Sequence, residues 1–317
     1  MANVRILCNC SIDHIPEAKR ILESVGEVTY AEYKYHRLFE AIGEYDALLP
    51  SLDVYLDQKV LQRARRLKLI ATPSTGTDHI DLKSAAKFGI EVMSLKNDID
   101  FLKKVTATAE LAFGLILSIT RRIPYAFDSV KQGAWKSKDF RGHELLDKTL
   151  GIIGYGRRGE MMARYAHAFG MCVLACDPYK IVHEDFVTQV DFETLLRSAD
   201  IITIHVHLNE ETNGMLSERA FSLMKEGVYI VNTSRGAVMD EEALLRALES
   251  GKVAGAALDV ICGELEGDFE NHPLICYART HDNLIITPHM GGVTYESQAK
   301  AYIFTARKIQ RFFHECL

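Results

Sequence analysis

A glycine-rich turn near the middle of this 317-residue chain limits what the chain can fold into. The turn, "GYGRRG" at residues 154–159, follows the apolar run "TLGII" and precedes "EMMARYAHAFG", which has helical spacing. The next apolar run, "CVLACD", ends in Asp177, 177 − 159 = 18 residues beyond the last glycine. Strand, glycine turn, helix, strand and acid in this order predict a βαβ unit that binds a dinucleotide.

The residue types in this turn predict how a dinucleotide would be held. The three glycines would permit, in order, a tight turn, close approach of backbone to a pyrophosphate, and close packing of helix on strand. A carboxylate at Asp177 would accept hydrogen bonds from ribose hydroxyls and repel a 2′-phosphate, so we expect NAD rather than NADP. Arg157 and Arg158 weaken this preference, because a guanidinium could meet a phosphate. The alternative is a turn that only packs a helix, with Asp177 as a helix cap.

Short β-type runs alternate with helical patterns along the chain, which predicts an α/β protein with two doubly wound parallel sheets. The first series contains "VRILC", "ALLP", "LKLIAT" and "IEVMS". The second contains "TLGIIG", "CVLACD", "DIITIHV", "VYIVNTS", "VAGAALDV" and "NLIITPH". The helical pattern from Val293 to Leu317 has no strand after it, so we place it back on the first domain. We expect a discontinuous domain at 1–98 and 292–317, with the domain at 99–291 inserted into it.

Composition excludes several classes of function. A net charge of −6 and a pI near 6.1 give no general attraction to nucleic acid or anionic membranes. The most apolar helical stretch, Thr108 to Ile119, is shorter than the roughly 20 residues that span a bilayer. Seven scattered cysteines and no secretory signal pattern predict a reducing cytoplasm.

Polar residues follow three strands of the second series, where open α/β sheets place their ligands. They are Arg235 in "VNTSRG", Asp259 and Glu264 in "ALDVICGE", and His289 in "ITPHMGG". An arginine can grip a carboxylate with two parallel hydrogen bonds. A histidine can exchange a proton near neutral pH, and a carboxylate beside it can orient the ring. These residues predict a site for hydride transfer to a carbonyl.

Several spaced motifs in one order carry a resemblance over nearly the whole chain. They are "STGTDHIDL", "TAE", "GIIGYGRRGE", "ITIHVHLNEETNGML", "VNTSRGAVMDEEAL", "GAALDV" and "TPHMGGVTYES". With them the chain resembles the D-isomer-specific 2-hydroxyacid dehydrogenases, in the branch similar to D-3-phosphoglycerate dehydrogenase. The resemblance implies a flavodoxin-like substrate domain with an inserted Rossmann NAD-binding domain. It implies an NAD-dependent oxidoreductase that interconverts a D-2-hydroxy acid and its 2-oxo acid, with phosphoglycerate or a sugar-derived hydroxy acid as candidate substrates.

The resemblance also implies roles for particular residues. His289 would be the general acid and base, Glu264 would orient it, and Arg235 would bind the substrate carboxylate. Substrate-binding amides are expected at Ser74, Thr75 and Gly76. Cofactor-binding residues are expected at Gly154, Tyr155, Gly156, Arg157, Arg158, Gly159, Asp177, His205, Thr233, Asp259, His289 and Gly291.

The resemblance further implies a homodimer that pairs through residues Thr106 to Arg122. Because few residues follow His289, we expect a short form without a regulatory domain.

The sequence departs from the family pattern in three places. Leu265 replaces the usual proline after the glutamate, and "HVHL" replaces "HxPL", which puts His207 near the expected adenine site. The segment 94–107 replaces the usual "N-x-P-x-x-N" and leaves the substrate open.

Two rival functions are considered. One is an NAD(H)-sensing, corepressor-like binding protein with little turnover. The other is a metal hydrolase built on His205, His207 and His289, although we expect no metal because no further ligands stand at a recognisable spacing. The Cys8/Cys10 pair is better explained by strand packing, and the basic run Lys59 to Leu69 by a solvated helix face.

Overall fold

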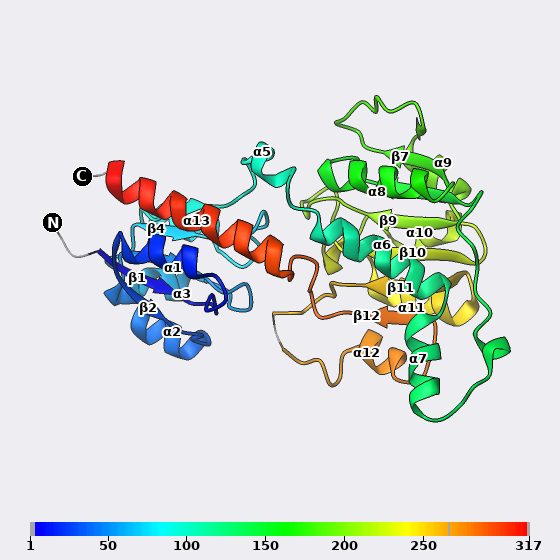
Figure 1. Ribbon diagram of the computed structural model, residues 1–317, viewed down its shortest axis with the longest axis horizontal. Coiled ribbons are helices and arrows are strands. Elements are labelled where there is room, and N and C mark those ends of the chain that lie inside the picture. The colour runs from blue at the N-terminus through cyan, green and yellow to red at the C-terminus, as the bar shows by residue number, and fades with distance from the viewer. Residues whose placement is uncertain (1–3, 266, 316–317) are drawn as a thin grey trace. The chain divides into compact units, whose positions relative to one another are not determined.

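The structure is a computed structural model that describes residues 4–265 and 267–315 (Figure 1). The chain divides into two compact units. The first contains residues up to Val105 together with those from Val293 onward, and the second runs from Thr106 to Gly292. Cys316 and Leu317, which the sequence places at the end of the last helix, lie outside the described residues.

Within the described residues, the first unit is built on a five-stranded parallel sheet of order β2-β1-β3-β4-β5. This is the flavodoxin-like order, so the expected class is confirmed. Its strands are β1 (Val4–Cys8), β2 (Gly26–Tyr30), β3 (Ala47–Leu49), β4 (Leu69–Ala71) and β5 (Glu91–Met93). Its helices are α1 (Pro16–Glu23), α2 (Tyr35–Ala41), η1 (Ile42–Glu44), α3 (Gln58–Arg63), α4 (Leu82–Lys87), α5 (Ile99–Leu102) and α13 (Tyr295–Glu315).

The last helix, α13, packs on the first unit, beside α1 (Figure 1). Ile309 and Phe313 join a core with Leu22 on one face of the sheet, and Arg307 Nη2 lies 2.7 Å from Glu17 Oε1. The helices α2, α3 and α4 cover the other face. The final helix therefore covers strands that are far from it in the chain.

The atypical segment 94–107 packs with α13. The ring of Phe101 in α5 stacks on Phe304 with centroids 4.2 Å apart, and Lys308 Nζ lies 2.6 Å from Asp98 Oδ2. These contacts attach α5 to the first unit. The boundary between the units accordingly falls after Val105, later than the residue-98 boundary drawn from the sequence.

Within the described residues, the second unit contains a seven-stranded parallel sheet of order β12-β11-β10-β9-β6-β7-β8. Its strands are β6 (Thr149–Ile153), β7 (Cys172–Cys176), β8 (Val187–Gln189), β9 (Ile201–Ile204), β10 (Val228–Asn232), β11 (Val253–Leu258) and β12 (Leu284–Ile286). Its helices are α6 (Ala107–Thr120), α7 (Ile123–Lys131), η2 (Ser137–Phe140), α8 (Arg157–Ala168), α9 (Phe192–Ser198), α10 (Glu218–Leu223), η3 (Gly236–Val238), α11 (Glu241–Ser250) and α12 (Pro273–Ala278).

Two apolar cores lie on opposite faces of this sheet. In one core, α6 and α8 pack on the sheet through residues such as Ile116 and Met162. In the other, the four helices α9, α10, α11 and α12 pack on the opposite face through residues such as Leu244. The helix α6 is largely buried, as its apolar sequence predicts. None of the described helices combines the length and apolar character needed to cross a membrane.

Three local expectations need correction. No strand is predicted at β2 or β8, because both lie at sheet edges and carry exposed polar residues that break the apolar pattern. The basic run from Lys59 to Leu69 is helical only as far as Arg63, since the chain turns at Ala64 and enters β4.

Candidate active site

Polar side chains gather at the carboxyl edge of the seven-stranded sheet, because all of its strands are parallel and end at this edge. In the order of the strands they are His289 after β12, Asp259 and Glu264 after β11, Thr233 and Arg235 after β10, His205 after β9, the Gly154–Gly159 turn after β6, and Asp177 after β7.

His289 and Glu264 form a hydrogen-bonded pair, with Nδ1 of the imidazole 2.9 Å from Oε1 of the carboxylate. An ionised carboxylate can only accept, so the Nδ1–H group of His289 donates this bond. The tautomer is thereby fixed, and Nε2 is left to exchange a proton with a ligand. The imidazole is 41% exposed, so a ligand can reach it.

The backbone of His289 has a φ of 51°, in the left-handed region that side chains other than glycine rarely adopt. Asp259, buried one strand away, holds this turn. Its Oδ1 accepts from Thr287 Oγ1 at 2.6 Å and from Met290 N at 2.9 Å, and its Oδ2 accepts from Gly291 N at 2.7 Å. The predicted residue Asp259 therefore orients the segment that carries His289, whatever it contacts in a ligand.

Arg235 is positioned by Asn232, a fully buried residue that the sequence interpretation missed. Asn232 Oδ1 accepts from the backbone N–H of Ser234 at 2.9 Å, and its Nδ2 donates to the Arg235 carbonyl at 2.9 Å. The following Gly236 is required, since a Cβ there would lie 2.2 Å from the carbonyl carbon of Ile261. A strand-terminal asparagine before a polar turn is an Asx-turn signal that could have revealed Asn232.

The glycine turn leaves space where a ligand is expected. Gly154 has a φ of 90°, and a Cβ there would lie 2.9 Å from the carbonyl carbon of His205. A Cβ on Gly156 would meet nothing within 4 Å. Gly156 also begins α8 without a side-chain cap, so the first N–H groups of the helix can receive an anion.

Three unpartnered atoms along this edge fit a polar, anionic cofactor. Among the described residues, Arg158 Nε, His205 Nδ1 and Thr233 Oγ1 are buried without a hydrogen-bond partner. Burial, reinforced by Arg157 and Arg235, lowers the pKa of Arg158 to about 10. Burial and the nearby charge of Arg158 lower the pKa of His205 to about 3, so this imidazole is neutral at physiological pH. The residues present therefore suit a phosphate-containing dinucleotide.

The Asp177 end of the edge is filled by contacts within the protein. Its Oδ2 accepts from Tyr155 N and its Oδ1 from Tyr179 N, both at 2.9 Å. Lys180 forms an ion pair with Glu160 of α8. The sequence interpretation did not pair Glu160 with Lys180, because Lys180 lies 20 residues further along the chain and belongs to no motif.

Ser74, Thr75 and Gly76 belong to the first unit, in the turn after β4. Ser74 Oγ donates to the Gly76 carbonyl at 2.5 Å and lies 2.9 Å from Thr72 Oγ1, so this turn is ordered by its own side chain.

The departures from the family pattern leave the hydrogen bond between His289 and Glu264 intact. Leu265 is partly exposed, and Glu264 still reaches His289. Nε2 of His205 lies 2.9 Å from Thr203 Oγ1. Within residues 4–265 and 267–315, no group of three or more His, Cys, Asp and Glu side chains is arranged to hold a metal ion.

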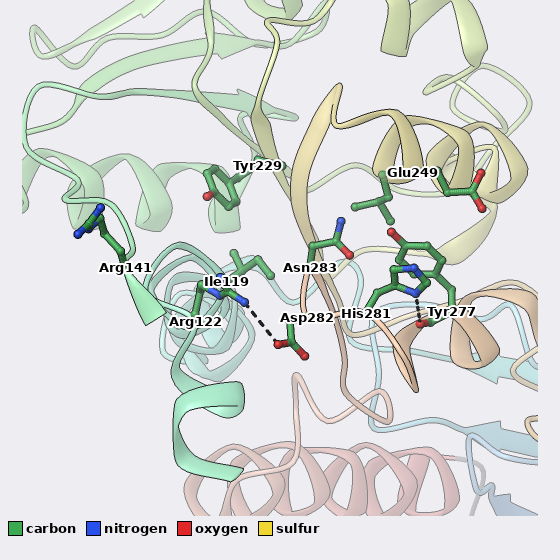
Figure 2. A pocket seen from close by; sticks show the side chains of 11 residues that line it. Ile119, Arg122, Arg141, Tyr229, Glu249, Tyr277, His281, Asp282 and Asn283 are labelled. Carbon is green, nitrogen blue, oxygen red and sulfur yellow. Dashed lines mark hydrogen bonds and ion pairs between the residues drawn. The ribbon is translucent and has the colours of Figure 1, made fainter. Parts of the chain in front are cut away.

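A cavity of about 510 Å³ lies elsewhere on this unit (Figure 2). It is lined by residues at the amino-terminal ends of the strands, including Tyr229, Ala254 and Asn283, and by Arg122, whose Nη2 lies 3.4 Å from Asp282 Oδ2. It therefore opens at the edge opposite His289 and contains none of the predicted site residues.

Comparison with known proteins identifies the family. The family model "D-isomer specific 2-hydroxyacid dehydrogenase, NAD binding domain" matches residues 113–291. The chain belongs to this family of D-isomer-specific 2-hydroxyacid dehydrogenases. It is 37% identical to a hydroxypyruvate reductase of Thermotoga maritima over 98% of both chains. It is 38% identical to a D-3-phosphoglycerate dehydrogenase of Methanocaldococcus jannaschii over 93% of this chain and 55% of that protein.

A solved structure gives the same assignment. The D-lactate dehydrogenase of Aquifex aeolicus, crystallised with NAD and lactic acid, is 31% identical, with a TM-score of 0.83 over 97% of this chain and 95% of that one. This dehydrogenase is thus an NAD-dependent oxidoreductase of 2-hydroxy acids, as expected from its motifs.

Proposed function

We propose that this dehydrogenase interconverts a small D-2-hydroxy acid of the glycerate type, with or without a phosphate, and its 2-oxo acid. The observation that carries the proposal is the His289–Glu264 pair, at 2.9 Å, on the same sheet edge as Arg235. The similarity to a hydroxypyruvate reductase over 98% of both chains supports this size of substrate.

In the proposed mechanism His289 exchanges the proton. For reduction, Nε2 of the protonated imidazole gives a proton to the carbonyl oxygen, and for oxidation it takes the hydroxyl proton. Glu264 holds Nδ1–H and stabilises the imidazolium that forms. Arg235 binds the substrate carboxylate with its guanidinium and fixes the reacting carbon.

The remaining residues are proposed to hold the ligands. NAD, when bound, supplies the hydride chemistry. The backbone N–H groups of the turn at 154–159 and of the first turn of α8 receive the pyrophosphate, and Asp177 receives the adenosine ribose. Toward the nicotinamide we place His205, Thr233, Asp259, His289 and Gly291.

The two units are proposed to divide the work. The second unit is the NAD-binding domain, and the family model for such a domain falls within it. The first unit is the substrate domain, and the backbone amides at Ser74, Thr75 and Gly76 bind the substrate.

We further propose that two copies associate through α7 and the segment that follows it. Most apolar side chains of α6 are buried within their own unit, whereas Phe127 is 63% and Trp135 87% exposed. Such exposed aromatic residues are typical of interfaces. Light scattering should give twice the mass of one chain for the wild type and the mass of a single chain for the variant F127E/W135K. A monomeric wild type would contradict this proposal.

We infer a reducing cytoplasm from the thiols. The described cysteines are all free, and even Cys8 and Cys10, whose Sγ atoms are 3.7 Å apart, are not joined by a disulfide. Thiol titration of protein purified without reductant should find them reduced, and a disulfide would contradict the inference.

The function is tested by NADH consumption over a panel of 2-oxo acids that includes hydroxypyruvate and 3-phosphohydroxypyruvate. We expect one substrate to dominate and Arg235→Lys to lower kcat/KM by about 100-fold, because an ammonium cannot form the two parallel bonds of a guanidinium. Arg219→Lys, a surface change in an ion pair with Glu193, is the matched control. NADH binding without turnover of any member would contradict the proposal and favour a sensor.

A further inference from the structure

Arg158 is a cation without a counter-charge. It is the second residue of α8, and its Nε is buried with no hydrogen-bond partner among the described residues. No described carboxylate forms an ion pair or hydrogen bond with its guanidinium. Arginine is almost never buried without a partner, because desolvation of the charge is then uncompensated. The position is therefore suited to an anionic ligand.

The residues around Arg158 make its uncompensated positive charge still less favourable. Both Arg157 and Arg235 lie close enough to disfavour its charge, and the pKa is lowered to about 10 mainly by burial. The nearby imidazole of His205 is neutral and offers no negative charge. An oxyanion placed among these groups would be attracted by all three guanidinium groups.

The order of the strands indicates which ligand group that is. Arg235 follows β10 and His205 follows β9, and β9 lies between β10 and β6, the strand that leads into α8. Asp177, proposed for the adenosine ribose, follows β7 on the other side of β6. Since β9 is the neighbour of β6, His205 and the first turn of α8 follow adjacent strands. Beyond the effect of burial, the charge of Arg235 contributes to the lowered pKa of Arg158, and the charge of Arg158 contributes to the lowered pKa of His205. We therefore place the Arg158 side chain in the half of the edge that carries the proposed reacting groups.

We propose that Arg158 binds a second anionic group of the substrate, a phosphate or second carboxylate, while Arg235 binds the carboxylate beside the reacting carbon. This inference rests on the proposed function and narrows its substrate class to 2-oxo acids with a second anionic group. Because they carry two anionic groups, these acids are called dianions below, and acids with the carboxylate alone are called monoanions. Arg158 is then a specificity-determining residue, and its unpaired charge in the free protein is compensated when substrate binds.

The test compares each substrate that carries a second anionic group with a relative that lacks it. Each pair is measured with the wild type, Arg158→Met and Arg158→Lys: 3-phosphohydroxypyruvate with hydroxypyruvate, and 2-oxopentanedioate with 2-oxopentanoate. We expect Arg158→Met to lower the preference in kcat/KM for the better dianion by about 10- to 100-fold, mainly through KM. Arg158→Lys, which keeps a positive charge, should retain part of the preference for the dianion. The monoanions should change by less than about three-fold.

A binding measurement separates this role from a cofactor role. Titration calorimetry gives the affinity for NAD alone, and then for the dicarboxylate tartronate added to the NAD complex. If the proposal is right, Arg158→Met lowers the affinity for tartronate and leaves the affinity for NAD nearly unchanged. Arg141→Met, an exposed arginine beside the cavity of Figure 2, is the matched control and should change neither.

Two results would overturn the inference. If Arg158→Met weakens NAD and lowers activity equally for dianions and monoanions, the guanidinium serves the pyrophosphate. If Arg158→Met leaves the preference for dianions unchanged, Arg158 does not recognise the second anionic group of the substrate. Failure of the proposed function looks different, because the wild type would then turn over no member of either pair.

Discussion

The two halves of the carboxyl edge of the NAD-binding unit differ in how far the protein satisfies its own polar groups. In the half formed by β7 and β8, Asp177 accepts two backbone N–H groups and Lys180 is paired with Glu160. In the half formed by β9 to β12, the buried Thr233 hydroxyl has no hydrogen-bond partner among the described residues, and His289 has a left-handed backbone. The first half is complete without ligand, whereas the second stores unfavourable interactions that a ligand can relieve.

The largest effect should come from removing the proposed acid–base group, His289, without disturbing its turn. His289→Asn suits the left-handed backbone, which asparagine tolerates, but cannot exchange a proton. We expect kcat/KM to fall by about 1,000-fold with little change in melting temperature. Retention of more than a tenth of the activity would show that another group transfers the proton. Steady-state kinetics and thermal unfolding on the same preparation check both parts.

Asp259→Asn should break the support of this turn. The carboxylate accepts three hydrogen bonds, and an amide would direct N–H toward backbone N–H. We expect the free energy of unfolding to fall by about 3 kcal/mol, as for other buried bonds to a charged group. Urea denaturation measures the loss. Asp177→Asn, in the other half, is the comparison, and an equal loss there would remove the distinction between the halves.

His205 should make stability depend on pH. Its pKa is about 3 in the folded protein and 6.5 when unperturbed, so between these values the unfolded chain binds a proton that the folded protein excludes. The stabilisation is thus present above pH 6.5 and is lost as pH falls, by about 1.4 kcal/mol per unit and about 2 kcal/mol at pH 5.

Urea titrations of the wild type and His205→Gln from pH 5 to 7.5 measure this dependence. The difference between the two proteins should grow toward neutral pH, because glutamine does not ionise. His183→Gln, at an exposed position, should follow the wild type. Parallel curves for wild type and His205→Gln would mean that the folded protein protonates this imidazole normally.

The smallest expected effect has the opposite sign. Arg158→Met removes an unpaired, partly buried charge and should raise the free energy of unfolding of the ligand-free protein by about 1 kcal/mol. A loss of stability would indicate that the guanidinium is already satisfied. Lys180→Met, which breaks an ion pair in the other half, should not stabilise the protein.

The sequence predicted what depends on neighbouring residues and on motifs. The parallel sheets, the glycine turn with its downstream Asp177, and the His289–Glu264 pair needed only strand patterns and family spacing. The edge strands β2 and β8 were missed because their alternation is weak. Contacts between distant segments were also missed: Asp259 with Thr287, and α5 with α13. No local sequence pattern indicates which acidic side chain accepts hydrogen bonds from which turn. These contacts can be identified only in the three-dimensional structure.

Alanine substitutions at two glycines of the glycine turn should differ in whether a stability measurement can detect their effect. At Gly159 a methyl group would lie 2.3 Å from the Gly154 carbonyl oxygen, so alanine there disturbs the backbone itself. At Gly156 the same methyl group meets empty space, and the backbone, with a φ of −78°, suits alanine. Gly156→Ala would therefore fold and accumulate normally while occupying the volume that we propose for the dinucleotide. A survey that scores expression or melting temperature would class it as harmless, and only a survey of ligand binding would detect the defect.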